Sequence, residues 1–328
     1  MIVVGDVGAT KTLLEVGVVR DGRWCPAFGR RYAGADHPDF NSVLAAFLRE
    51  WAACGQAGEK LTHACFGVAG PAFGNRTQMT NLAWVVDGNA IRTEFGIAHV
   101  RVVNDFAAAA SGIEMLQDAD LVVLQPGEPI AAAPRVVIGA GTGLGIAYLS
   151  WAAGGYQVIA GEAGHAGFAP STLEQLELWR DLYASQGGVA VERVVSGPGL
   201  VRIHEFLRRR EAQPAAPADA PHVGVTPAAI THGVLQLGDA LCMRALDLFI
   251  ACYGAVAGDH ALAVMARGGV YVAGGIAPKI LPHLLAGGFL AAFNARGSHA
   301  DDVRKIPVAI VTNERVGLLG AALLAARS

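Results

Sequence analysis

One pattern of short strands and glycine turns occurs twice in this chain, and it limits the possible folds more than any other sequence feature. The first copy has apolar strands joined by turns at Gly8 and Asp21-Gly22; the strands cover residues 2–6, 12–19 and 25–32. The second has turns at 139–143 and 153–155; its strands cover residues 135–138, 144–150 and 156–160. Short apolar runs bounded by glycine are typical of strands. The repeat predicts a duplicated α/β fold with one glycine loop in each half.

The rest of the chain supports this division into two halves. A length of 328 residues exceeds what one hydrophobic core usually serves, so two domains are expected. Further strands are predicted at residues 63–68, 100–103, 269–273 and 306–311, and helices at residues 41–53, 235–266, 317–326 and from Phe106 onward. The Pro- and Ala-rich segment 211–224 is predicted to be an exposed loop.

Composition excludes several classes of function. A net charge of −3 disfavours nucleic acid or an anionic membrane as a partner. The longest uncharged apolar run in the C-terminal half, between Asp247 and Asp259, is too short to span a bilayer, and it predicts a buried helix. Five scattered cysteines and an opening MIVVGDVG without a signal-peptide pattern predict a cytoplasmic protein.

The first glycine loop is built from Gly5, Asp6, Val7, Gly8, Ala9 and Thr10. Convergent backbone N–H groups in such a loop can hold phosphate oxygens, although a plain hairpin turn explains the sequence equally well. It is not a Walker A loop, because a strand rather than a helix is expected to follow. Asp6, at the end of a strand, suits Mg²⁺, bound directly or through water.

The second glycine loop, GAGTGLG, contains Gly141, Thr142 and Gly143. It superficially resembles a dinucleotide-binding fingerprint, but that motif opens a helix and a strand is expected here. Two related loops in one chain indicate phosphate binding more strongly than either loop alone.

Polar residues that could contact a substrate occur at three further places. Asn104 and Asp105 lie at a strand-to-helix junction, where an Asp is either a helix cap or, in a cleft, a proton acceptor. Glu162 and His165 lie in GEAGH, where they are either ordinary turn residues or partners of sugar hydroxyls; zinc is not expected. Glu192 by itself resembles a helix-end acid, and Gly274-Gly275 serves either tight packing or an adenine surface.

Taken in order, these segments resemble the bacterial ATP-dependent glucokinases of the hexokinase/actin-like superfamily, which are related to the ROK sugar kinases. The motifs are GDVGATKT, MTNLAW, VVNDF, GAGTGLG, GEAGH, ERVVSGPGL, VAGGI and VGLLGAA, and they extend from about Gly5 to Ala322. The resemblance implies a duplicated ribonuclease H-like fold with an interdomain cleft. It also implies a small domain of residues 1–105 plus 302–328, a large domain of residues 106–301, and a homodimer.

The resemblance also implies a role for each candidate residue. Asp105 would be the general base, while Asn104, Glu162, His165 and Glu192 would hold the hydroxyls of glucose. ATP would lie on Gly5–Thr10, Gly141–Gly143 and Gly274-Gly275, with Mg²⁺ near Asp6. The chain departs from the family at Ala9, where glycine is usual, and at Lys11, where Asn is frequent. Two alternatives stay open. The chain could be a kinase for mannose, fructose or an N-acetylhexosamine, or a non-catalytic actin-like nucleotide- or sugar-sensing protein.

Overall fold

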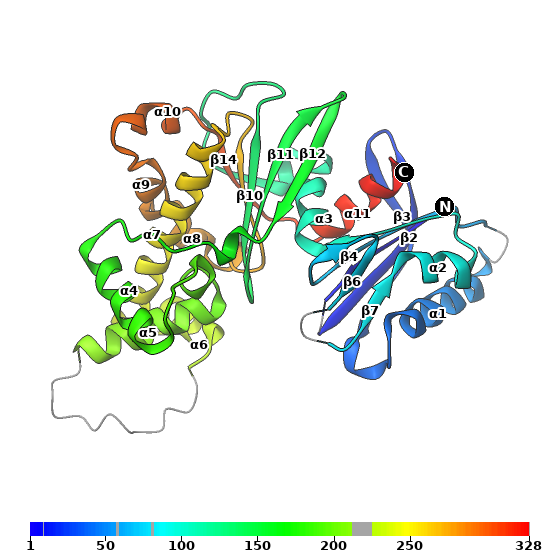
Figure 1. Ribbon diagram of the computed structural model, residues 1–328, viewed down its shortest axis with the longest axis horizontal. Helices are drawn as coiled ribbons and strands as arrows, with labels where there is room; N and C mark the ends of the chain where they lie inside the picture. The colour runs from blue at the N-terminus through cyan, green and yellow to red at the C-terminus, as the bar shows by residue number, and fades with distance from the viewer. Residues whose placement is uncertain (9, 57–58, 80–81, 212–224, 328) are drawn as a thin grey trace. The chain divides into compact units, whose positions relative to one another are not determined.

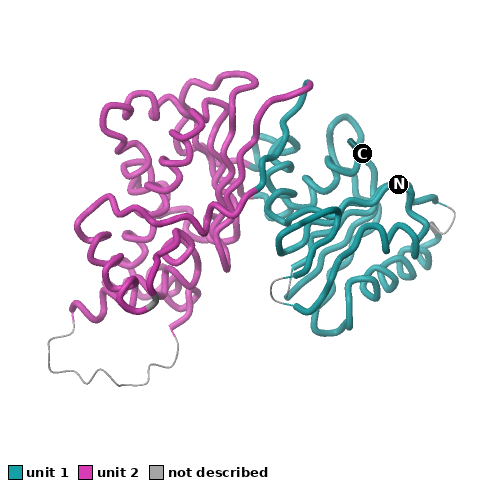
Figure 2. The backbone as a smooth tube through the Cα atoms, in the orientation of Figure 1, with its two compact units in different colours: residues 1–120, 154–160, 313–328 teal, residues 121–153, 161–312 magenta. Residues whose placement is uncertain are grey.

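A computed structural model describes residues 1–8, 10–56, 59–79, 82–211 and 225–327. Contacts divide the chain into two compact units, coloured separately in Figure 2. The first unit contains residues 1–120, 154–160 and 313–328, and the second contains residues 121–153 and 161–312. The predicted loop at 211–224 lies, apart from Glu211, outside the described residues. The domain boundaries near residues 105 and 302 stay a prediction.

The first unit is built on a five-stranded sheet of order β3-β2-β1-β4-β8 (Figure 1). Its strands are β1 (Ile2–Val7), β2 (Lys11–Arg20), β3 (Arg23–Ala33), β4 (His63–Val68) and β8 (His99–Asn104). Strands β1, β2 and β3 form an antiparallel meander, whereas β4 is parallel to both β1 and β8. Since the carboxyl ends of parallel strands meet at one edge of a sheet, the ends of β1 and β8 lie at the same edge.

The second unit repeats this order of strands. β10 (Arg135–Ala140) pairs antiparallel with β11 (Leu144–Ala152) and parallel with β13 (Val270–Ala273), which is parallel to β14 (Val308–Val311). A further edge strand, β9 (Leu121–Gln125), runs antiparallel to β14. β12 (Gly155–Gly161) follows β11 along the chain, and all but its last residue belong to the first unit by contacts. The predicted duplication is confirmed.

Both faces of the first sheet are covered by helices. Val3 and Val4 point to opposite faces because successive strand residues alternate, and both are fully buried. α1 (Phe40–Trp51) packs on the Val3 face, and α11 (Val316–Ala326) packs on the Val4 face. α11 lies against α3 (Asp105–Gly112) so closely that a Cβ atom on Gly320 would overlap the carbonyl oxygen of Ala108.

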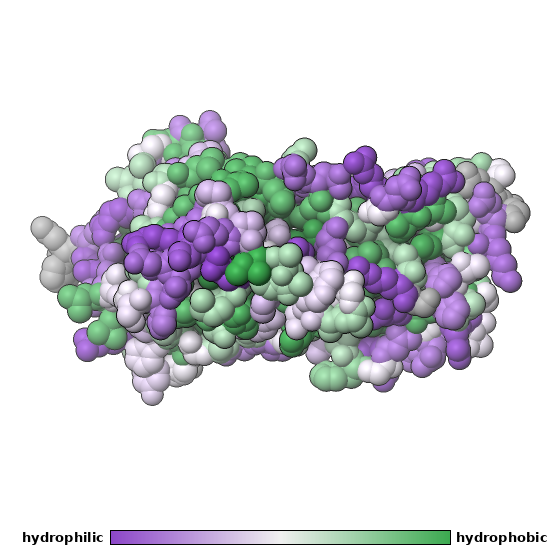
Figure 3. Space-filling model, turned by 90° about the horizontal axis from the view of Figure 1, so that it is seen from above, coloured by the Kyte–Doolittle hydropathy of each residue, from purple (hydrophilic) through white to green (hydrophobic). Residues whose placement is uncertain are grey.

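The second unit has a larger helical layer around one core. Its central helix, α7 (Ala240–Ala263), is the one described helix long and apolar enough to cross a membrane by length and composition. Two-thirds of its most apolar window is nevertheless buried (67%), as the sequence predicts for a core helix. It packs against α9 (Gly288–Asn294) through Gly254 and Gly258. On the face shown in Figure 3, hydrophilic and hydrophobic residues are mixed over both units.

The remaining elements are short or were not predicted from the sequence. A small three-stranded sheet consists of β5 (Ala72–Phe73), β6 (Arg76–Gln78) and β7 (Val85–Asp87). The other α-helices are α2 (Gly88–Phe95), α4 (Leu173–Gln186), α5 (Gly197–Glu211), α6 (Pro227–His232), α8 (Leu281–Leu285) and α10 (Ala300–Arg304). The long helix predicted at 235–266 begins only at Ala240, where Asp239 accepts a hydrogen bond from the N–H of Cys242 as N-cap.

Candidate active site

The first glycine loop joins β1 to β2 as a hairpin, so the strand expected after it is confirmed and a Walker A loop is excluded. The N–H of Gly8 donates to the carbonyl of Lys11 at 3.0 Å. Thr10 is exposed, whereas Val7 is fully buried in the core. A Cβ on Gly5 would lie 2.7 Å from the Leu14 side chain, so glycine is required there for packing. Ala9 lies outside the described residues.

Asp6 lies on β1 beside the first turn of α11. Its carboxyl carbon is 3.8 Å from the point where a Cβ of Gly317 would lie. Burial raises the pKa of this carboxyl, and the charge of Lys11 lowers it in part. A carboxylate that is costly to ionise here would be stabilised by a bound cation.

Asn104 and Asp105 lie where β8 ends and α3 begins. Asn104 is the N-cap: its Oδ1 accepts hydrogen bonds from the N–H groups of Phe106 at 2.9 Å and Ala107 at 3.0 Å. Its Nδ2 donates to the carbonyl of Gly70 at 3.1 Å. Asp105 follows as the first helical residue, and its Oδ1 also accepts from the Phe106 N–H, at 2.8 Å. Because Asn104 caps the helix, Asp105 is not needed as its N-cap.

The second glycine loop joins β10 to β11, again followed by a strand, so the dinucleotide-binding reading is excluded. The segment 192–197 is hydrogen-bonded to this loop at both of its ends. Glu192 Oε2 accepts from the N–H of Leu144 at 2.8 Å, and the N–H of Gly197 donates to the carbonyl of Gly141 at 2.8 Å. Glu192 lies in a short 3-10 helix, Val191–Arg193, as a helix-end acid would, and its carboxylate is held beside the loop.

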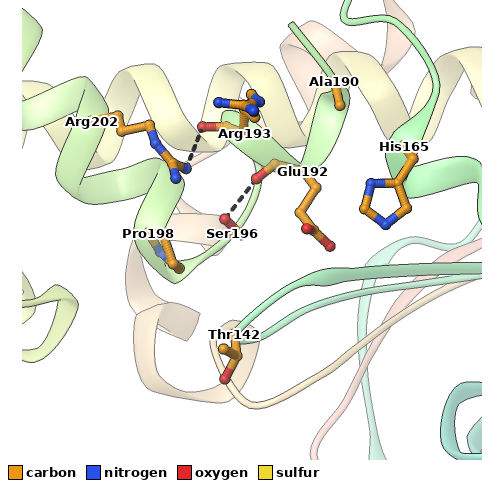
Figure 4. A pocket seen from close by; sticks show the side chains of 8 residues that line it. All are labelled: Thr142, His165, Ala190, Glu192, Arg193, Ser196, Pro198 and Arg202. Carbon is orange, nitrogen blue, oxygen red and sulfur yellow. Dashed lines mark hydrogen bonds between the residues drawn. The ribbon is translucent and has the colours of Figure 1, made fainter. Parts of the chain in front are cut away.

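Glu192, His165 and Thr142 line one pocket of the second unit, about 380 Å³ in volume (Figure 4). The His165 ring lies on the side of the pocket that the Glu192 carboxylate faces. Gly164, beside His165, must be glycine because a Cβ would overlap the carbonyl of Leu144. Glu162 is exposed, and its Oε2 lies 4.0 Å from His165 Nε2. The structure thus brings together three residues that lie far apart in the sequence.

Gly274 and Gly275 follow β13 and have different surroundings. Gly274 has a φ of 82° in the left-handed region, and a Cβ there would lie 2.5 Å from the carbonyl oxygen of Ala140. A Cβ on Gly275 would have no neighbour within 4 Å. Gly274 therefore packs against the strand that leads into the second loop, and Gly275 leaves open space.

Arg193, Ser196 and Arg202 also line the pocket, although no role is predicted for them from the sequence. Arg202 donates to the carbonyl of Arg193 at 3.2 Å, and Ser196 Oγ donates to the carbonyl of Glu192 at 2.6 Å. Ser196 Oγ in turn accepts from the N–H of Gly199 at 3.0 Å. The four-residue spacing of Ser196 from Glu192 is the sequence signal that could have linked them, because a serine hydroxyl often donates to the main-chain carbonyl four residues earlier.

Residues 3–328 match the family model described as Glucokinase. The chain belongs to the glucokinase family. It is 41% identical to the glucokinase of Nostoc punctiforme over 343 aligned residues, which cover 100% of this chain and 99% of that protein. A crystal structure of a glucokinase from an Antarctic psychrotroph matches with a TM-score of 0.85 and 27% identity, covering 100% and 99% of the two chains.

Glucokinase-family membership confirms two predictions from the sequence. The actin- and hexokinase-like fold is confirmed. It is shared with a ROK family glucokinase from Streptomyces griseus, whose crystal structure contains glucose and AMPPNP. That structure matches with a TM-score of 0.65 and 21% identity, covering 100% of this chain and 99% of the other. The chain is an enzyme of the hexose kinase type. The roles of individual residues stay predictions.

Proposed function

We propose that this glucokinase-family chain transfers the γ-phosphoryl group of ATP to the 6-hydroxyl of D-glucose. The observation that carries the proposal is the joining of Glu192 and His165 with the second glycine loop in one pocket. A sugar needs several fixed acceptors and donors, and a phosphate needs close backbone N–H groups. Glu192 and His165 are groups of the first kind, and Thr142 brings the glycine loop to the same pocket.

The first unit would supply the base. Asp105 would accept the proton of the 6-hydroxyl while the hydroxyl oxygen bonds to the γ-phosphorus and ADP leaves. Asn104 would use the remaining N–H of its amide toward the sugar, since its Oδ1 caps α3. The backbone of residues 5–10 would contact phosphate near Gly8 and Thr10, because Gly5 and Val7 are packed inside the core.

The second unit would supply most of the sugar contacts. Glu162, His165 and Glu192 would bind hydroxyls, and the backbone of Gly141, Thr142 and Gly143 would bind phosphate. Gly274 and Gly275 would border the adenosine, Gly275 more directly because of its open space. Positioning accounts for most of the catalysis in phosphoryl transfer, so these contacts matter as much as the base.

Mg²⁺ is proposed at Asp6. A carboxylate is the hard oxygen donor that Mg²⁺ prefers, and one or two such groups suffice when phosphate oxygens and water complete the octahedron. Burial of Asp6 and the raised pKa of its carboxyl fit a group whose charge a cation would stabilise. Bound there, Mg²⁺ would neutralise charge on the phosphates.

An ADP-release assay over glucose, mannose, fructose and N-acetylglucosamine tests the proposal. We expect glucose to give the highest kcat/KM. A higher value for another sugar would make the chain a kinase for that hexose. Nucleotide binding with no sugar-dependent ADP release would instead identify a non-catalytic actin-like protein and overturn the proposal.

A cytoplasmic homodimer is proposed as the working form. The five cysteines are all free thiols, which fits a reducing compartment. The second unit has large exposed apolar side chains, including Leu173, Tyr183 and Leu237, which a subunit interface would bury. Light scattering after size-exclusion chromatography measures the mass directly, and a mass of one chain would contradict the dimer.

A further inference from the structure

We propose that Gly143, although it belongs to the phosphate-binding loop, is a positioning residue for glucose. In this proposal the missing side chain at residue 143 leaves room for the Glu192 carboxylate. The inference rests on the proposed function, because it takes Glu192 to be a ligand of the sugar.

The geometry around Gly143 differs from that around Gly141 in the same loop. A Cβ on Gly143 would lie 2.5 Å from Glu192 Oε2 and 3.2 Å from its carboxyl carbon. Real Cβ atoms almost never come within 3.0 Å of a non-bonded atom, so one group would have to move. A Cβ on Gly141, two residues earlier, would have no neighbour within 4 Å. The space at Gly143 is thus filled by the end of one side chain.

The group that would move is the one proposed to hold the sugar. Both close contacts of the added methyl group are atoms at the flexible end of Glu192, and no backbone atom lies as near. An alanine at residue 143 can therefore be accommodated by rotation of the Glu192 side chain. That rotation would take Oε2 away from the N–H of Leu144, its partner at 2.8 Å, and would leave the carboxylate without a fixed position.

Backbone movement does not offer an easy alternative. The segment that carries Glu192 is joined to the loop by the hydrogen bond from Gly197 N–H to the carbonyl of Gly141 at 2.8 Å. Within the loop, Gly141 N–H donates to the carbonyl of Gly143 at 2.8 Å. One backbone hydrogen bond thus ties the segment to the loop, and a second braces the loop at Gly143, so displacement falls on the side chain (Figure 4 shows Glu192, Ser196 and Thr142 around the pocket).

The test compares Gly143→Ala with Gly141→Ala, which adds the same methyl group to the same loop. Glucose affinity is measured by isothermal titration calorimetry without nucleotide, and KM for glucose and for ATP by ADP release. For Gly143→Ala we expect the Kd and KM of glucose to rise about tenfold or more, the usual effect of losing a charged hydrogen bond. For Gly141→Ala we expect the Kd of glucose to stay within about twofold, with any loss confined to KM for ATP.

Three outcomes would overturn the inference. The first is a Gly143→Ala variant that weakens ATP alone. The second is a variant with unchanged glucose affinity. The third is a variant whose unfolding midpoint falls steeply, because the contacts predict that only a side-chain end must move.

Glu192→Ala separates failure of the inference from failure of the proposed function. If Glu192→Ala leaves glucose affinity unchanged, the assignment of Glu192 to the sugar is wrong. If it weakens glucose while Gly143→Ala does not, only the inference fails. In the double variant we expect Gly143→Ala to add less than about twofold to the loss caused by Glu192→Ala, because coupled residues are not additive.

Discussion

The two glycine loops occupy equivalent places in two copies of one sheet, yet they differ in where their charged side chains come from. The loop between β1 and β2 carries its own charges, with Asp6 before the turn and Lys11 after it. The loop between β10 and β11 has no charged residue and receives the carboxylate of Glu192 from 48 residues further along the chain. The first loop therefore suits a metal–phosphate complex. In the proposed function, the second would connect phosphate binding to the recognition of a neutral sugar.

The comparison shows how one duplicated scaffold can acquire two functions. The strand order is retained, since it determines which strand ends meet at one edge. What changes is the connection after the third strand: in the first unit it leads through α1 directly to β4, and in the second it contains Glu162, His165 and Glu192 before β13. The residues proposed to bind the sugar thus lie in the longer connection of the second unit, and Glu192 is held against the start of β11 by its hydrogen bond with the N–H of Leu144.

The largest expected effect separates chemistry in the first unit from binding in the second. Asp105→Asn retains the size of the side chain but removes the proton acceptor, so kcat should fall by about 10² or more with the Kd of glucose changed less than about threefold. Glu192→Gln should show the opposite split, with a raised KM for glucose and a smaller loss in kcat. Steady-state kinetics and calorimetry measure both. Near-normal kcat in Asp105→Asn would remove Asp105 as the base.

A second prediction concerns the helices that cover the first sheet. Gly320→Ala places a Cβ against the carbonyl oxygen of Ala108. This backbone oxygen cannot move away unless the whole of α3 shifts off the sheet. Overpacking of this kind costs about 1–3 kcal/mol, so the thermal midpoint should fall by several degrees. Gly317→Ala in the same helix is the control, because its nearest neighbour would be 3.8 Å away. Equal midpoints for the two variants would show that the α3–α11 contact is loose.

A third prediction tests whether the first loop carries a buried charge. Because burial raises the pKa of Asp6 in the folded chain, ionising it costs stability, and that cost appears as pH rises from its unfolded pKa through the folded value. Asp6→Asn should therefore raise the thermal midpoint at pH 7, by roughly 2–4 °C for each tenfold difference in proton affinity. The gain should shrink toward pH 4.

The matching functional measurement for Asp6 is KM for Mg-ATP. Asp6→Asn should raise it, because the amide is a weaker cation ligand than a carboxylate. A variant that is neither more stable nor weaker toward Mg-ATP would contradict both halves of the assignment. An equivalent change in the second loop is not possible, since that loop has no carboxylate of its own.

The smallest expected effect concerns the cap of α7 in the second unit. Asp239→Ala removes the acceptor of the Cys242 N–H and should cost about 1 kcal/mol in chemical denaturation. The hydrogen bond to Cys242 lowers the pKa of Asp239, so this contribution is present above its unfolded pKa and is lost as pH falls through the folded value. Asp239→Asn, which keeps a capping oxygen, should recover most of the stability. No difference between the Ala and Asn variants would exclude the cap.

The sequence predicts the sheet well and the site residues less completely. His63–Val68 was predicted without error, because a buried strand between polar ends has a clear local pattern. β9 was missed because its pairing with β14 depends on residues nearly 190 positions away. At the end of β8, Asn104 rather than Asp105 is the N-cap of α3. The sequence does not predict this, because two adjacent polar residues are both suitable caps and only the side-chain geometry distinguishes them. Gly5 is likewise predicted to serve the phosphate loop, whereas in the structure the side chains of Leu14 and Phe66 leave no room for a side chain there.

The position of α11 has a consequence for how the protein is made. This helix consists of residues 316–326, yet it covers Val4 and Cys65 on the sheet formed by the first third of the chain. During synthesis that apolar face emerges from the ribosome long before its cover exists, and it stays open to water or to chaperones while the second unit is translated. Completion of the N-terminal half therefore waits for the last residues to be added. A nascent chain stalled before residue 316 should expose this face, whereas the released chain should bury it.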